Sequence, residues 1–87
     1  MTLKIDSDSD EQDMVLRLSG RLQSEHMELL KALIEGSEQR VVLDLQDVKL
    51  VDRDVVRFLG GCEVNGIELR HCSPYIREWI LKEKASS

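Results

Sequence analysis

The sequence predicts an α/β domain, a small mixed β-sheet of about four strands with about three helices packed on it. Two observations lead to this fold class. Segments rich in β-branched and aliphatic residues alternate along the chain with segments whose apolar residues recur at helical spacing. The chain has 87 residues, enough for one hydrophobic core, so we expect a single domain over residues 1–87.

The N-terminal part predicts two strands joined by a turn. Leu3–Ile5 is a short strand and Met14–Leu18 a longer one. Between them, Asp6–Asp13 carries five acids in eight residues. Its Asp-x-Asp-x-Asp opening matches a calcium loop, but Glu11 and Arg17 stand where that loop needs Gly and Glu. We therefore expect a solvated turn and no calcium site.

A helix is predicted from Ser24 to Ile34. Ser24 is the expected N-cap, and Gly36 is expected to end the helix. The apolar residues that share one face of this helix are Met27, Leu30, Leu33 and Ile34.

Val41–Leu45 is the strongest strand in the sequence, and Val48–Val51 follows it closely. Its nearly continuous apolar character predicts an interior strand covered on both faces. Asp44 interrupts the run, and strand alternation points it out of the main core. We expect backbone amides or a basic residue to bind its carboxylate.

The second helix is predicted to begin at Asp52 and to run to about Val64, where Asn65-Gly66 ends it. Its expected buried residues are Val55, Phe58, Leu59 and Cys62. Gly60-Gly61 falls inside this helix, where glycine is unfavourable. Close packing on the sheet or on a neighbouring helix is the favoured explanation. The alternative is a shallow surface that a partner's backbone approaches.

The last predicted strand is Ile67–Cys72, followed by a helix with Ser73 as N-cap and Pro74 at its first position. Its apolar side consists of Ile76, Trp79 and Ile80. The polar tail Lys82–Ser87 is expected to fray.

Composition limits the functions that this chain can have. The formal net charge is −5, from 17 acidic against 12 basic residues, which argues against nucleic acid and anionic membrane surfaces as partners. No apolar stretch approaches the roughly 20 residues of a spanning helix, and the N-terminus lacks the apolar core of a signal peptide. We therefore predict a cytoplasmic protein without direct membrane insertion.

The residues that could carry chemistry do not form a catalytic pattern. His26 and His71 have no neighbouring nucleophile with an orienting group. Cys62 and Cys72 lack a metal-ligand spacing, apart from His71 beside Cys72, and are expected to be half-buried thiols. The sequence therefore predicts no enzyme, no catalytic residue, no metal site and no cofactor.

The charged cluster Asp52-Arg53-Asp54, with Arg57 one turn later, is the most informative local feature. It lies where a strand ends and a helix begins, the edge at which open α/β sheets bind partners. Both acids also suit the positive end of the helix dipole. A capping role and a binding role both remain open for this cluster.

The segment Val15–Ile80, about three quarters of the chain, resembles the STAS domain of anti-sigma factor antagonists and of sulfate transporters. The matching pieces, in order, are Leu16–Leu22 (Leu-Arg-Leu-Ser-Gly-Arg-Leu), Val41–Leu45, Val48, Val51-Asp52, Gly66–Leu69 and Ser73–Glu78. The resemblance implies a STAS-like fold and a regulatory module that binds an anti-sigma factor or a kinase-like partner.

The chain departs from the STAS pattern at the helix start. The resemblance implies a serine or threonine after the aspartate, whose phosphorylation ends binding. Here Arg53 and Asp54 follow Asp52, and Val55 stands where a glycine often follows, so no hydroxyl remains within this loop. We therefore expect no phosphorylation site. The sequence also ends soon after the Ser-Pro helix, where longer members add a strand and a helix. An edge strand is then left open for pairing, for example in a homodimer.

We predict a regulatory protein-interaction module. The residues assigned to its partner-binding site are Gly20, Arg21, Asp52, Arg53, Asp54 and Arg57. Two alternatives are a soluble STAS subunit that regulates a membrane transporter of the ABC type, and a domain that binds a nucleotide or another small ligand.

Overall fold

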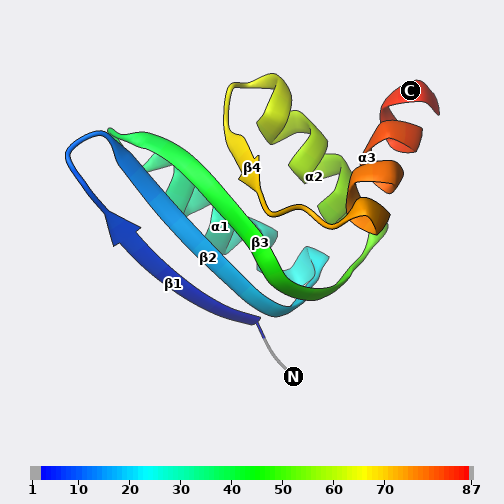
Figure 1. The fold of residues 1–87 in the computed structure, drawn as a ribbon, viewed down its shortest axis with the longest axis horizontal. Coiled ribbons are helices and arrows are strands. Elements are labelled where there is room, and N and C mark those ends of the chain that lie inside the picture. The colour runs from blue at the N-terminus through cyan, green and yellow to red at the C-terminus, as the bar shows by residue number, and fades with distance from the viewer. Residues whose placement is uncertain (1–2, 87) are drawn as a thin grey trace.

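The computed structural model describes residues 3–86 (Figure 1). The elements in chain order are β1 (Leu3–Ser9), β2 (Asp13–Leu22), a short 3-10 helix η1 (Ser24–His26), α1 (Met27–Glu35), β3 (Arg40–Val51), α2 (Arg53–Val64), β4 (Glu68–Arg70) and α3 (Pro74–Ser86). The predicted order of strands and helices is confirmed, with η1 as an addition.

The four strands form one sheet in the order β1-β2-β3-β4. β1 is antiparallel to β2, whereas β2, β3 and β4 are parallel to one another. The predicted small mixed sheet with three helices is thus confirmed. Figure 1 shows α1 behind β2 and β3, and α2 and α3 next to each other beyond β4. β1 and β4 are the edges of the sheet.

The first hairpin is longer than predicted. β1 continues to Ser9, which pairs with Met14, so only residues 10–12 make the turn. The Asp10 carboxylate stabilises this turn by accepting hydrogen bonds from the backbone N–H groups of Gln12 and Asp13, at 2.8 and 2.7 Å. The expected turn exists, but the assignment of residues 6–9 to it is wrong. Those residues pair with β2 and expose their side chains.

The other strand boundaries also differ from the prediction. β2 passes through Gly20, which has a φ of 92° and lies at an irregularity in the register, and it ends at Leu22. β3 joins the two predicted segments into one strand of 12 residues. β4 has only three residues, because His71 adopts a φ of 57° and leaves the extended conformation.

The start of α1 was predicted at the wrong residue. Gln23, not Ser24, caps η1, and α1 follows from Met27. The ring of His26 accepts a hydrogen bond from the Gln23 N–H at 3.2 Å, so the residue two positions past the predicted cap closes this turn. Gly36 ends α1 as predicted. Leu33, expected in the core, is 36% exposed.

The caps of α2 and α3 are confirmed. Asp52 caps α2, which ends at Asn65 and Gly66, and Gly66 has a φ of 89°. The Ser73 hydroxyl accepts a hydrogen bond from the Ile76 N–H at 3.3 Å at the start of α3. α3 continues to Ser86, so the described part of the tail Lys82–Ser87, which is predicted to fray, is helical. Ser87 lies outside the described residues. No helix within residues 3–86 has the length and apolar character that a bilayer crossing requires.

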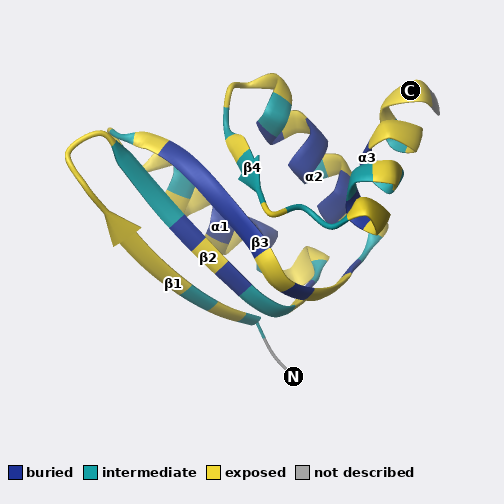
Figure 2. Ribbon diagram, in the orientation of Figure 1, coloured by how far each residue is buried: buried dark blue, intermediate teal, exposed yellow. Residues whose placement is uncertain are grey.

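The core lies on one face of the sheet. Val41, Leu43 and Leu45 belong to the same apolar cluster as residues of all three helices. α1 and α2 cover this face, and α3 packs against α2. Val42, which points the other way, lies outside the cluster although it is 1% exposed. Figure 2 shows β3 as the most continuously buried strand. The interior position of β3 is confirmed, but side chains of neighbouring strands, not a second helical layer, cover its other face.

Candidate functional site

Asp52 joins the starts of two helical segments at the carboxyl end of the sheet. Its Oδ1 accepts a hydrogen bond from the Val55 N–H at 3.0 Å, within the first turn of α2. Its Oδ2 accepts one from the Ser24 N–H at 2.9 Å, at the start of η1. The Ser24 hydroxyl also helps to lower the pKa of this carboxylate. One side chain therefore fixes both segments to the end of β3.

The surroundings of Asp52 favour its charged form. Burial alone would raise its pKa, but the backbone hydrogen bonds from Val55 and Ser24 outweigh that effect and lower the pKa below its ordinary value. Both oxygens are engaged, so this residue acts as a structural clamp. The exposed charges around it belong to the residues that follow.

Arg53, Asp54 and Arg57 project from the first turns of α2. All three are exposed. The Nε atoms of Arg53 and Arg57 lie 3.4 and 3.1 Å from the same Oε1 of Glu83, on α3. Arg57 is the main cause of a lowered pKa at Glu83. Both arginines remain more than half exposed, at 63% and 58% of their side chains.

Gly20 and Arg21 lie at the same end of the sheet as Asp52. They pair with Val48 and Leu50 of β3. The Ser24–Asp52 hydrogen bond joins the segment after β2 to the segment after β3. The structure therefore brings together the two sequence segments that carry the predicted site. Arg21 is exposed at this end. We call the exposed surface of Arg53, Asp54 and Arg57 the charged corner. Ser24 was missed by sequence reasoning, because only the parallel pairing of β2 and β3 places it beside Asp52.

α2 and α3 pack against each other along a seam of ion pairs. Arg53 and Arg57 meet Glu83 near one end of α3, and Arg77 near the other end meets Glu63 with its Nη1 2.7 Å from Oε2. The order of these contacts shows that the helices are antiparallel. The hydrogen bond from Arg77 is the main cause of the lowered pKa of Glu63. Lys84 also reaches Glu63, at 3.1 Å, which holds the end of α3 in place.

Gly60 and Gly61 have different surroundings. A Cβ at Gly60 would be in ordinary contact with α3, 3.5 Å from Cε of Lys84 and 3.6 Å from Cγ2 of Ile80, so this residue is packed against α3 although alanine would also fit. Apart from its chain neighbours and the backbone of its own helix, a Cβ at Gly61 would meet no described atom within 4 Å. The favoured explanation, close packing, therefore describes the surroundings of Gly60 and is wrong at Gly61.

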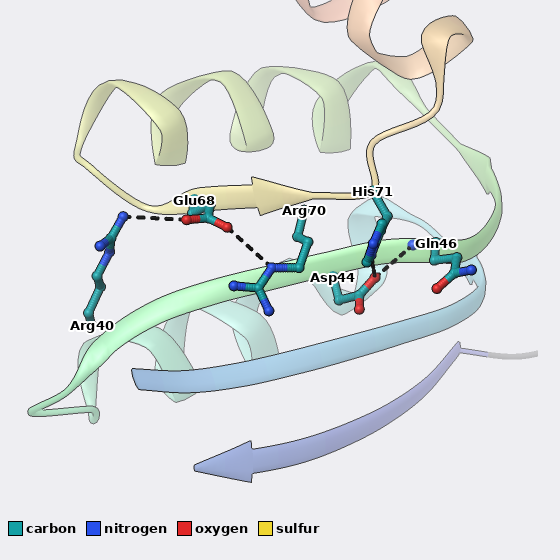
Figure 3. Close-up of polar contacts among 6 residues, drawn as sticks. All are labelled: Arg40, Asp44, Gln46, Glu68, Arg70 and His71. Atoms are coloured by element: carbon teal, nitrogen blue, oxygen red, sulfur yellow. Dashed lines mark hydrogen bonds and ion pairs between the residues drawn. The ribbon is translucent and has the colours of Figure 1, made fainter. Parts of the chain in front are cut away.

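The sheet face opposite the core carries a polar cluster (Figure 3). The His71 ring points toward Asp44, with Nδ1 3.2 Å from Oδ1, and the Gln46 N–H donates to the same oxygen at 3.0 Å. The expectation of a backbone amide and a basic group around Asp44 is confirmed. Asp44 is 9% exposed. A shallow hollow of about 430 Å³ lies here, lined only by strand residues and His71.

Charges alternate across all four strands on this polar face. Asp6, Arg17, Asp44 and Arg70 stand opposite one another in successive pairs of the register. We call these four residues the cross-strand charge row. Burial tends to raise the pKa of Asp44, but Gln46, His71 and Arg17 together lower it. These charged side chains explain how this face of the sheet can remain exposed to solvent, since no described helix covers it.

The remaining candidate groups do not assemble into a reactive centre. Within residues 3–86, no three His, Cys, Asp or Glu side chains are grouped as a metal site would require. Cys62 is buried rather than half-buried, and burial raises the pKa of its thiol to about 11. Cys72 is half-buried as predicted. His26 and His71 serve the contacts described above.

Among known proteins, similarity is found to solved structures, several of which match this chain. No protein-family model and no curated protein matches the sequence. An uncharacterized protein of the DUF3478 family with a SpoIIAA-like fold, from Shewanella loihica PV-4, is 17% identical, with a TM-score of 0.44. The match covers 77% of this chain and 61% of that one, so the chain spans less than two thirds of its length. A likeness of this degree says nothing of what either protein binds.

Proposed function

We propose that this chain is a regulatory module that acts by binding a protein, through the charged corner, and that it does no bond-making chemistry of its own. The partner class implied by the sequence resemblance is an anti-sigma factor or a kinase-like regulator. The segments that carry the resemblance, around Gly20 and around Asp52, are those that meet at the corner.

The observation that carries this proposal is the double hydrogen bonding of Asp52. Because its two oxygens hold the Ser24 and Val55 N–H groups, the chain segments at the corner are already ordered before any partner arrives. A pre-ordered surface loses less conformational entropy on binding. Arg53 and Asp54 then project exposed charges of both signs, which suits selection between partners more than raw affinity.

The corner differs from a phosphorylation switch. The two residues after Asp52 are Arg53 and Asp54, so α2 begins without a hydroxyl. Asp54 supplies a fixed negative charge, smaller than that of a phosphate. Binding by this module is therefore expected to be controlled by the partner's abundance or state rather than by modification at the start of α2.

Affinity capture with the tagged full chain, from cells that express it natively, tests the proposal. The variant Arg53→Ala with Asp54→Ala removes two exposed charges at the corner. The matched control, Glu28→Ala with Lys31→Ala, removes one exposed charge of each sign from α1. We expect the corner variant to lose a partner that the wild type and the control retain, at unchanged thermal stability.

Equal capture by the two double variants would remove the corner as the binding site. Identification of the captured protein by mass spectrometry tests the partner class. An anti-sigma factor or kinase-like protein supports the assignment, whereas a transporter subunit contradicts it.

A further inference from the structure

A groove runs between the antiparallel helices α2 and α3. Its volume is about 580 Å³. Its apolar floor consists of the buried residues Val56, Gly60 and Ile80, and the exposed Val64 lines one end. We call it the α2–α3 groove. It begins at the charged corner and follows α2 toward its C-terminal end, where Val64 is 75% exposed.

Gly61 lies on the exposed surface of this groove and has no internal reason to be glycine. Apart from its chain neighbours and the backbone of its own helix, nothing in the described chain lies within 4 Å of the position that its Cβ would take, and the residue is helical. Glycine disfavours the middle of a helix because it loses the most backbone freedom on folding. An unfavourable residue that the protein's own packing does not require is expected where another backbone approaches closely.

The charges around the groove contrast with those of the whole chain. Its charged lining residues are Arg53, Arg57 and Lys84 against a single acid, Glu83, although the chain carries a net charge of −5. Glu83 is only 16% exposed, while Arg53 and Arg57 are more than half exposed. Lys84 is paired with Glu63. The positive rim that a ligand meets above the apolar floor is therefore that of Arg53 and Arg57, two exposed cations that share the one carboxylate of Glu83.

From this combination we propose that the α2–α3 groove receives an acidic amphipathic helix of the protein partner. The inference rests on the proposed function and names the chemistry of the partner's segment. An extended segment would need an open strand edge for its backbone hydrogen bonds, and two helices offer none. A helix satisfies its own backbone and can place apolar residues on the floor. Its acidic flanks would then meet Arg53 and Arg57.

The dimensions set the length of the bound segment. α2 has 12 residues, which at 1.5 Å per residue is about 18 Å. The partner segment is therefore about three helical turns long, with apolar residues on one face at i, i+4 and i+7 spacing. A helix that crosses at Gly61 can come closer to α2 than one that meets a larger side chain.

Two synthetic peptides test the charge and the location. Both are about three turns long with the same apolar face, and the flanks are glutamate in one and lysine in the other. They are titrated into the isotope-labelled full chain and followed by NMR. We expect the acidic peptide to bind about tenfold more tightly at low salt and to lose this advantage in high salt. The largest shifts are expected at Val56, Gly61 and Val64.

Variants then test the close approach at Gly61. Gly61→Gln adds a side chain where the structure has room, so the fold is retained, and it should weaken binding of the acidic peptide about tenfold by blocking the approach of a helix. Lys31→Gln on α1 is the control and should not change it. Equal affinity for both peptides, shifts on α1 or the polar sheet face, or no effect of Gly61→Gln would each overturn the inference. Concentration-dependent shifts of the groove without peptide would do so too, because the occupant would then be a second copy.

The two proposals can fail separately. If the corner double variant loses the native partner while Gly61→Gln retains it, the groove inference fails and the proposed function stands. If neither variant alters capture but the acidic peptide still binds the groove, the groove is a binding site and the proposed function fails.

Discussion

Arg17 of β2 lies directly opposite Asp44 of β3 in the parallel register of the sheet. Asp6 and Arg70 extend this pair on its two sides into the cross-strand charge row. A slip of one residue in any strand pair would turn these charges toward the core. The row therefore holds the register of a sheet that has helices on one face only.

Reversing the charge at Arg17 tests the row. Arg17→Glu places like charges opposite Asp6 and Asp44, and we expect it to lower the free energy of unfolding by about 1 kcal/mol. Urea denaturation measures the change. Arg17→Gln, which removes the charge without reversing it, should lower the free energy of unfolding by less. Added salt should reduce the difference in stability between the two variants. A Glu variant as stable as the Gln variant would show that the row contributes nothing.

Substitutions at His71 test whether the left-handed backbone conformation after β4 costs stability. Both His71→Ala and His71→Gly remove the ring that contacts Asp44. Only glycine also relieves the φ of 57°. We therefore expect the Gly variant to be more stable than the Ala variant by about 1 kcal/mol in thermal or chemical unfolding. Equal stability would mean that the backbone relaxes without cost.

Substitution of Asp52 tests how much its hydrogen bonds at the charged corner contribute to stability. Asp52→Ala removes hydrogen bonds to two helical segments and should lower the free energy of unfolding by about 2 kcal/mol at pH 7. Asp54→Ala, in the same turn but not a cap, should cost clearly less. A similar loss of stability in both variants would mean that Asp52 acts only through its charge at the positive end of the helix dipole.

The same residue predicts a pH dependence. The pKa of Asp52 is lower in the folded chain than its ordinary value. Its contribution to stability is therefore fully present above the unfolded value of about 4. It disappears as the pH falls through the lowered folded value. The stability gap between the wild type and Asp52→Ala should accordingly shrink in acid unfolding curves, and a gap that grows would contradict the direction.

The adjacent glycines of α2 predict opposite effects for one substitution. Gly61→Gln enters open space and should raise the free energy of unfolding by about 0.5–1 kcal/mol through helix propensity. Gly60→Gln must fit against Ile80 and Lys84 and should lower it by about 1–3 kcal/mol. Alanine should be tolerated at both positions. Destabilisation by Gly61→Gln would show that the open surface at this residue closes in solution.

We expect Cys62 to react slowly with thiol reagents. With a pKa of about 11, only about one thiol in a thousand is ionised at pH 8, and burial blocks access. The folded chain should therefore be modified at Cys62 far more slowly than the unfolded chain, as mass spectrometry of the labelled peptides can show. Cys72, half-buried, should react first. Rapid labelling of Cys62 without denaturant would indicate local opening of α2.

The order of the elements and the cap of α2 could be predicted from the sequence because their signals are local. Strand boundaries could not, since pairing is a tertiary property. Asp6–Ser9 has the composition of a turn, yet it is a strand because β2 supplies its hydrogen-bond partners. Ile67–Cys72 has the composition of a strand, yet the backbone at His71 ends it early.

The candidate site shows the same limit. Asp52 could be found as a cap from its position before an apolar helical pattern, but its second hydrogen bond joins it to a residue 28 positions away. The apolar run Val41–Leu45 predicts burial but not what covers it. Val42 and Asp44 are buried without a helix above them, by side chains of β2, β4 and His71, which no single-strand pattern specifies.

The outer edge of the sheet gives the protein a means of keeping copies of itself apart. β1 offers an unpaired row of backbone groups, and Asp6 and Asp8 stand exposed along it. Two chains that tried to join edge to edge at neutral pH would bring carboxylates together. Added salt weakens this repulsion, because it screens exposed charges. High salt should therefore favour strand-to-strand association between folded copies of the domain.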